Sequence, residues 1–286
     1  MNFAVSLLVV LLLAAPSSAA PVPNSQTEWT RLTSELAGMG LPSRFLQLLP
    51  SEFVKLEFAE LKMAAAEYHP EEHRMIFNRA LSEDNQGRRF RPLREIGNHD
   101  LATMYHELFH AYFDYIDFAA GTSQMPPEGA RLYDAAKRFV ACRYTVVDVI
   151  LVPQQKGRQR AARIEQRRLS DSEGWDALNE TWGVFVGWAI WNRLEVTNRL
   201  SLRWDWEVVE EFLNRLEEAA QSGDITGYFE PADPDARKVV PRWYLAPSNA
   251  ISPPEIALLL ESILGESHEM AQLAMSWISS DETKSC

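Results

Sequence analysis

The chain has few cysteines and few basic residues. Its 2 cysteines, Cys142 and Cys286, form no zinc-binding pattern. A disulfide between them is disfavoured, because a residue at the end of a chain is usually mobile. Basic residues number 28 against 40 acidic ones, so the formal net charge is −12. This charge argues against nucleic acid as a partner and favours solubility.

Long hydrophobic runs are also scarce. One apolar run, residues 4–15, is short for a membrane span and is followed by small residues up to Ala20. This pattern predicts a signal peptide over residues 1–20, cut after Ala19 or Ala20, and an exported protein, secreted or periplasmic. No Lys or Arg precedes the run, so an uncleaved N-terminal helix is the alternative. No later segment predicts a membrane span.

Hydrophobic residues make up 46% of the chain, which indicates a globular protein. We expect a single domain over residues 21–286, with residues 200–286 as a candidate helical subdomain. The predicted fold class is mainly α with a small β-sheet. Two short extended stretches are expected around a turn in residues 67–78, and the basic run 156–168 is interpreted as a solvated helix or a flexible insertion. Helical patterns cover 28–39, 43–49, 52–66, 128–150, 174–198, 204–220 and 254–279.

Residues 106–110 read His-Glu-Leu-Phe-His inside a helical pattern that Asp100 can cap and Gly121 can end. Positions i and i+4 share one face of a helix, so His106 and His110 can present two imidazole nitrogens to one cation. Glu107 stands beside them, where a carboxylate can take a proton from a metal-activated water. The pattern predicts a zinc site.

Zinc in a catalytic site has three protein ligands, so the two histidines need a third. A metzincin would continue the motif with Gly and His at fixed positions, but residues 111–113 are Ala-Tyr-Phe and residue 116 is Ile. That class is excluded. The other histidines lie in no matching motif, so an acidic third ligand is expected; they are His69, His73, His99 and His268.

The segment HELFHAYFDY, residues 106–115, resembles the active-site helix of thermolysin-like gluzincin metallopeptidases through Ala111, Asp114 and Tyr115. The resemblance covers the motif helices, well under a quarter of the chain. It implies a zincin-like fold, bound zinc and a third ligand from a Glu on a later helix, commonly introduced by Asn. Asn179-Glu180 fits that description.

Glu180 has rivals for the ligand role. Glu128 follows His110 at the shorter spacing of many gluzincins, but it falls in the first turn of its helix, where a Glu is common. Glu180 lies on an apolar helix, where a buried carboxylate needs a strong partner. Gly183 and Gly187 fall on the same face and would let a neighbouring helix approach closely. Glu180 is therefore the predicted ligand, with Glu128, Glu173 and Asp176 as alternatives.

The chain departs from the family pattern at Val184, where gluzincins carry the Asp that supports a metal histidine. Asp114 or Asp176 would have to supply that carboxylate. The resemblance also implies a residue that stabilises the oxyanion and an edge strand that pairs with the substrate. The stretch Met75 to Asn78 corresponds to that strand in position. The candidates for the oxyanion residue are Tyr228, Tyr244 and His268.

These features predict an exported zinc metallopeptidase that acts on a peptide or protein substrate. Zinc held by His106, His110 and Glu180 would activate a water molecule, with Glu107 as the general base. The alternative is a non-catalytic zinc-binding or scaffold protein with a zincin fold. The intact Glu107 favours the enzyme, because a structural zinc site needs no general base.

Overall fold

The structure is a computed structural model that describes residues 20–21, 25–62, 64–84, 87, 89–151, 163–200 and 206–278. Of the predicted signal peptide, residues 1–19 lie outside the described residues. Within the described ranges the protein is mainly α-helical with small β-sheets, as the sequence predicts. Among these residues, no helix has the length and apolar character that crossing a membrane requires.

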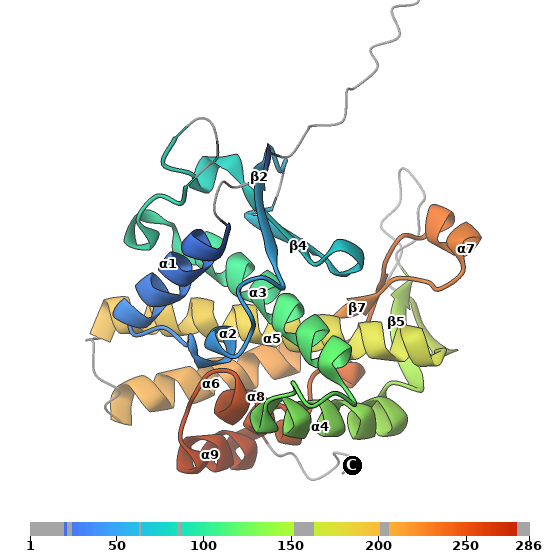
Figure 1. Ribbon diagram of the computed structural model, residues 1–286. Coiled ribbons are helices and arrows are strands. Elements are labelled where there is room, and N and C mark those ends of the chain that lie inside the picture. Colours follow the sequence, from blue (N-terminus) through green and yellow to red (C-terminus); the bar gives the residue numbers. More distant parts are fainter. Residues whose placement is uncertain are drawn as a thin grey trace, which may run out of the picture.

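The long helices pack around a central pair (Figure 1). This pair consists of α3 (Asn98–Ala119) and α5 (Asp171–Leu200). The other helices are α1 (Ser25–Gly38), α2 (Arg44–Gln47), α4 (Pro127–Arg143), α6 (Trp206–Ser222), α7 (Pro234–Val239), α8 (Pro253–Ser262) and α9 (His268–Ile278).

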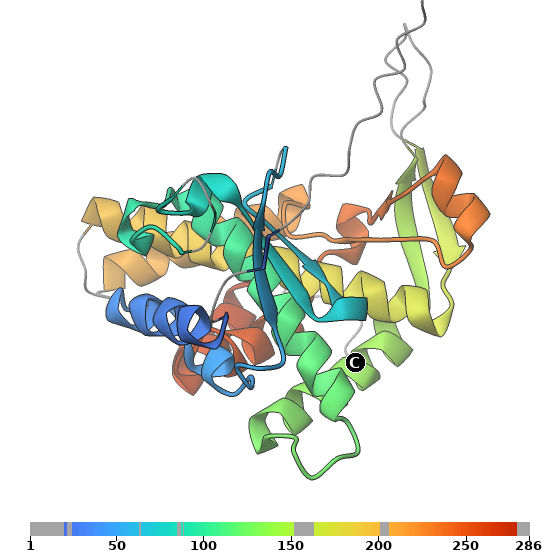
Figure 2. The same ribbon diagram turned by 45° about the horizontal axis from the view of Figure 1, so that its top comes forward.

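The main sheet has four strands in the order β1-β2-β4-β3. They are β1 (Ala20–Pro21), β2 (Lys55–Ala59), β4 (Arg74–Asn78) and β3 (Ala66–His69). Strands β2 and β4 are parallel, and the other pairs are antiparallel. The sheet lies over α3, which contacts β3 and β4 as well as α5 (Figure 2). The helix that carries the motif is therefore held between the sheet and α5.

The predicted extended stretches around residues 67–78 are confirmed as β3 and β4. The placement of the edge strand is wrong, however. Strand β4, which contains Met75 to Asn78, pairs with β2 on one side and β3 on the other, so the edge of the sheet next to the motif is β3.

Helices α3 and α5 approach closely at two glycines, as the sequence predicts. A Cβ atom on Gly183 would lie 2.9 Å from Cε1 of His110. A Cβ atom on Gly187 would lie 3.0 Å from the carbonyl oxygen of Ala102. Side chains at either position would push the helices apart. Helix α5 is also buried as expected, with Trp182 and Phe185 fully inaccessible.

Two helical predictions are wrong, and the described part of the basic run is neither a helix nor a flexible insertion. Residues 55–59 form β2, with Leu56 and Phe58 buried on the sheet. The helix predicted for residues 128–150 ends at Arg143, and the β-branched stretch that follows forms β5 (Val146–Leu151). Part of the basic run forms β6 (Arg163–Arg168), which pairs with β5, while residues 152–162 lie outside the described residues. Pairing with another strand overrides the local helical pattern of residues 55–59 and 146–150.

Two smaller expectations also change. Helix α3 begins at Asn98 after Gly97, so Asp100 lies in its first turn and does not cap it. Cys142 is disulfide-bonded, so the expectation that a disulfide is disfavoured is wrong. Cys286 lies outside the described residues.

The segment between α6 and α8 brings a small two-stranded sheet against α5. It consists of β7 (Tyr228–Phe229) and β8 (Trp243–Tyr244). A Cβ atom on Gly227 would lie 2.5 Å from the backbone nitrogen of Thr181, so only glycine permits this approach. The close contact places Tyr228 next to Glu180.

Candidate metal centre

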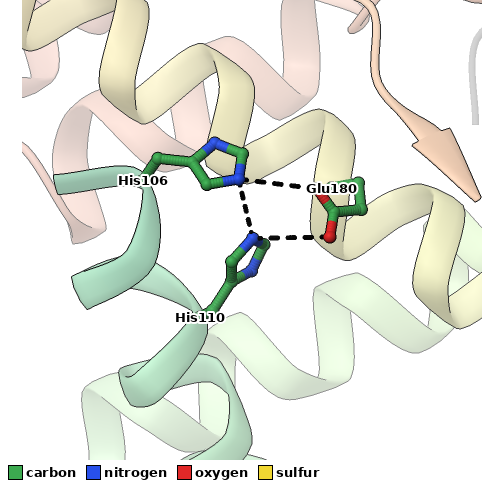
Figure 3. A group of neighbouring side chains, drawn as sticks. All are labelled: His106, His110 and Glu180. Carbon is green, nitrogen blue, oxygen red and sulfur yellow. Dashed lines mark hydrogen bonds and ion pairs between the residues drawn. The ribbon is translucent and has the colours of Figure 1, made fainter. Parts of the chain in front are cut away.

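The structure brings His106, His110 and Glu180 together, two from α3 and one from α5. The Nε2 atoms of the two histidines are 2.9 Å apart. Glu180 Oε2 is 3.4 Å from Nε2 of His106, and Glu180 Oε1 is 3.6 Å from Nε2 of His110. Both imidazoles and the carboxylate point toward a common centre (Figure 3). They are the single group of three metal-ligating side chains found in the described part of the chain.

This set of donors could hold a metal ion, and its residue types are those that zinc prefers. A tetrahedral site with bonds of about 2.0 to 2.2 Å places its ligand atoms about 3.3 to 3.6 Å apart. The two separations between Glu180 and the histidines lie in this range, and the two Nε2 atoms are closer, at 2.9 Å. Two imidazole nitrogens and one carboxylate are a common donor set for catalytic zinc. Glu180 Oε2 is buried and makes no hydrogen bond within the described residues, so a charged oxygen is available to a cation.

The electrostatics of the group also favour a cation. Burial alone would raise the pKa of Glu180, but the imidazoles of His110 and His106 outweigh it and hold that pKa well below its usual range. Burial would lower the pKa of His110, but the negative charges of Glu180 and Glu107 raise it to about 9. Without a metal, the three side chains therefore hold a proton at neutral pH.

The rival ligands lie elsewhere. Glu128 pairs with Arg44 at 2.9 Å, on the exposed start of α4. Glu173 accepts hydrogen bonds from the backbone nitrogens of Ser170 and Ala232. Asp176 accepts one from the backbone nitrogen of Glu230. Of the four carboxylates considered from the sequence, Glu180 is the one that reaches both histidines.

Asn179 supports His110, in the role that the sequence predicts for Asp114 or Asp176. Nδ1 of His110 lies 3.0 Å from Oδ1 of Asn179. With Nδ1–H donating to this amide oxygen, Nε2 is left to bind a cation. Asp114 instead contacts Tyr68 and His73. That expectation is therefore wrong for His110, because the residue directly before Glu180 already occupies the position.

The two carboxylate oxygens of Glu107 face different neighbours, one toward β3 and one toward His106. Its Oε2 accepts a hydrogen bond from the backbone nitrogen of Tyr68 at 2.9 Å, and its Oε1 lies 4.0 Å from Nε2 of His106. Burial is the main reason why the pKa of Glu107 is raised, although His110 and His106 act in the opposite direction. A carboxylate with a raised pKa is suited to accept and return a proton near neutral pH.

Two of the three donors, His110 and Glu180, line a cleft of about 580 Å³ between β3, α3, α5 and the segment that begins with β7. Phe113 and Trp175 stack at 5.0 Å between ring centroids and form an apolar part of its wall. The acidic side chains that line it are Glu67, Glu71, Glu107, Asp114, Asp117, Glu173, Asp176, Glu180 and Glu230, and the basic ones besides the histidines are Arg237 and Arg242. The cleft is therefore strongly acidic.

Of the three oxyanion candidates, Tyr228 alone lines the cleft. Burial and the nearby charge of Glu180 raise its pKa well above the usual range, so the hydroxyl stays protonated. Tyr244 is exposed on the neighbouring strand, and the exposed His268 pairs with Glu261 at 2.7 Å. Arg242, whose guanidinium lies 4.7 Å from the centroid of the Tyr228 ring, is not predicted from the sequence. Arg242 lies in a long loop-rich segment without a recognisable motif, so its neighbours in the sequence do not indicate a role in the site.

A comparison of the chain with models of protein families, with curated proteins and with solved structures finds no match. The resemblance to gluzincins therefore depends on the motif residues alone.

Proposed function

We propose that the protein is an exported zinc-dependent peptidase of gluzincin type with a zincin-like fold. The observation that carries this proposal is the position of Glu180, which reaches both motif histidines from a second helix while Glu107 stands beside them. His106, His110 and Glu180 would hold the zinc. When bound, zinc supplies a Lewis acid that polarises a peptide carbonyl and lowers the pKa of water.

Glu107 would perform the proton transfers. Its Oε1 accepts a proton from the attacking water, whose oxygen bonds to the carbonyl carbon of the substrate. As the carbon–nitrogen bond breaks, Glu107 returns the proton to the leaving amine. Tyr68 donates to Oε2 throughout, which keeps Oε1 directed toward the histidines.

Tyr228 would stabilise the developing oxyanion. Its hydroxyl is protonated and lines the cleft next to Glu180. A protonated hydroxyl that is already in place donates a hydrogen bond to the negative oxygen without reorganisation. Arg242, over the face of the tyrosine ring, adds positive charge on the same side of the cleft.

Two observations support the remaining parts of the proposal. The disulfide at Cys142 is typical of an oxidising compartment, which agrees with export. The acidic cleft next to the donors provides room for a peptide or protein substrate. The placement of Glu107, with one oxygen turned toward the histidines, favours catalysis over a merely structural zinc site.

The test uses the purified protein and its Glu107→Gln variant. We expect one zinc per chain in both, by elemental analysis, and hydrolysis of casein by the wild type alone. A chelator should abolish the activity, and added zinc should restore it. A wild-type protein that binds zinc without hydrolysing peptides would support the non-catalytic alternative. An active Glu107→Gln variant would overturn the mechanism.

A further inference from the structure

Tyr68 is held at two points by the helix that carries the motif. Its backbone nitrogen donates to Glu107 Oε2 at 2.9 Å, and its hydroxyl donates to Asp114 Oδ2 at 2.5 Å. Glu107 and Asp114 lie about two helical turns apart and so share one face of α3. A single residue of the edge strand β3 thus contacts two carboxylates of α3.

Asp114 also holds the other end of the turn that follows β3. Oδ2 of Asp114 lies 2.7 Å from Nδ1 of His73, the last residue before β4. His73 has a φ of 50°, a left-handed conformation that costs a non-glycine residue about 1 kcal/mol or more. Its ring packs on Phe53 at 4.1 Å between centroids. The contacts with Asp114 and Phe53 offset that cost.

These contacts have a consequence for Glu107. Strand β3 is at the edge of the sheet, so in the described structure one of its sides has no neighbouring strand. On that side the Tyr68 nitrogen determines where Glu107 Oε2 lies, and thereby where Oε1 points. Without Asp114, the contacts to the Tyr68 hydroxyl and His73 are lost together.

We propose that Asp114 and the Tyr68 hydroxyl are positioning residues that hold β3 against Glu107 and so orient the general base. Neither group touches the three metal donors. Burial, followed by the hydrogen bond to Asp114, raises the pKa of Tyr68 well above its usual range, so the hydroxyl remains a donor throughout the working pH range.

The test compares Tyr68→Phe, Asp114→Ala and Asp114→Asn with the wild type. We expect kcat to fall about 10- to 100-fold in the first two, the range typical of partners that orient a catalytic group, with KM changed little. Asp114→Asn keeps an acceptor oxygen and should recover part of the rate. The double variant Tyr68→Phe/Asp114→Ala should be no slower than Asp114→Ala alone. Zinc content should stay at one per chain.

Tyr115→Phe is the matched control. Tyr115 lies on the same helix and donates to the carbonyl oxygen of Gln124 at 3.3 Å, away from the metal donors. It should retain wild-type kcat. If kcat falls only in variants that have also lost zinc or folded protein, the proposal is overturned. An unchanged kcat in Tyr68→Phe would overturn it as well.

A second measurement separates this inference from the proposed function, on which its kinetic part rests. Amide hydrogen exchange of residues 66–69 in the metal-free protein should be faster in Tyr68→Phe and Asp114→Ala than in the wild type or Tyr115→Phe. If the wild type proves inactive, the peptidase proposal fails. Amide hydrogen exchange then tests by itself whether Asp114 and the Tyr68 hydroxyl hold β3 in place, which is the anchoring role. Faster exchange would support that role, and unchanged exchange would overturn it.

Discussion

Gly183 lies directly against His110, so close that a Cβ atom there would stand 2.9 Å from Cε1 of the imidazole and 3.1 Å from Cε1 of His106. The backbone of α5 therefore forms one wall of the proposed zinc site. This contact links the packing of the two central helices to the position of the donors.

We expect Gly183→Ala to lower zinc affinity by about 10- to 100-fold, because the added methyl group displaces both imidazoles. Competition with a zinc indicator measures the affinity. Gly38→Ala is the matched control, because nothing lies within 4 Å of a Cβ atom at that helical glycine. It should bind zinc normally and raise stability by about 0.4 to 1 kcal/mol. Normal zinc affinity in Gly183→Ala would contradict the geometry.

Glu180→Ala should lose most of its zinc, whereas Glu128→Ala should retain it. Glu180 contacts both histidines, and Glu128 pairs with Arg44. Elemental analysis and melting temperature should be measured together for both variants. The reverse pattern would transfer the ligand role to Glu128. If Glu180→Ala lowers the melting temperature but keeps its zinc, Glu180 is structural.

His106→Ala and His110→Ala should each abolish stoichiometric zinc, because either change removes one of the two nitrogens that α3 supplies. Asn179→Ala should weaken binding less, by about 10- to 100-fold, because it removes the partner of Nδ1 but leaves all three donors. Elemental analysis after dialysis is the measurement. Full zinc content in both histidine variants would exclude the site.

Zinc binding should release a proton at pH 7. In the metal-free protein the pKa of His110 is raised to about 9, so its imidazole is charged at neutral pH and must lose that proton to bind zinc. Calorimetry in buffers of different ionisation enthalpy measures the number released. Zinc affinity should rise between pH 6 and 9, and an affinity independent of pH would contradict the prediction.

The same pKa shift predicts how the metal-free protein responds to base. The folded-state pKa of His110 lies above its unfolded value of about 6.5, so its stabilising contribution is complete below that pH and is lost as pH rises through about 9. The melting temperature of the metal-free protein should therefore fall across this window. The melting temperature of the metal-free His110→Gln variant should fall less over the same pH window.

The acidic cleft should favour cationic substrates. Nine carboxylates line it against two arginines. We expect peptides with Arg or Lys near the cleaved bond to have higher kcat/KM than otherwise identical peptides with Glu, by about tenfold at low salt. The difference should shrink as ionic strength rises, because salt screens the interaction. Equal rates at low salt would contradict this prediction.

Local sequence was sufficient to predict the part of the candidate site that lies on one helix. His106, Glu107 and His110 follow from spacing alone, because the helical repeat places i and i+4 on one face. The buried character of α5 and the close approach at Gly183 and Gly187 also followed from residue type and periodicity. The extended stretches that form β3 and β4 were also predicted from residue type.

The tertiary structure decided what depends on contacts between distant segments. It places Glu180, and not Glu128, against both histidines, and it places Tyr228, and not Tyr244 or His268, in the cleft. Only packing between distant segments decides these positions. It also introduced Asn179 as the partner of His110. Residues 55–59 and 163–168 form strands because they pair with β4 and β5, and the residues of a single segment contain no information about such pairing.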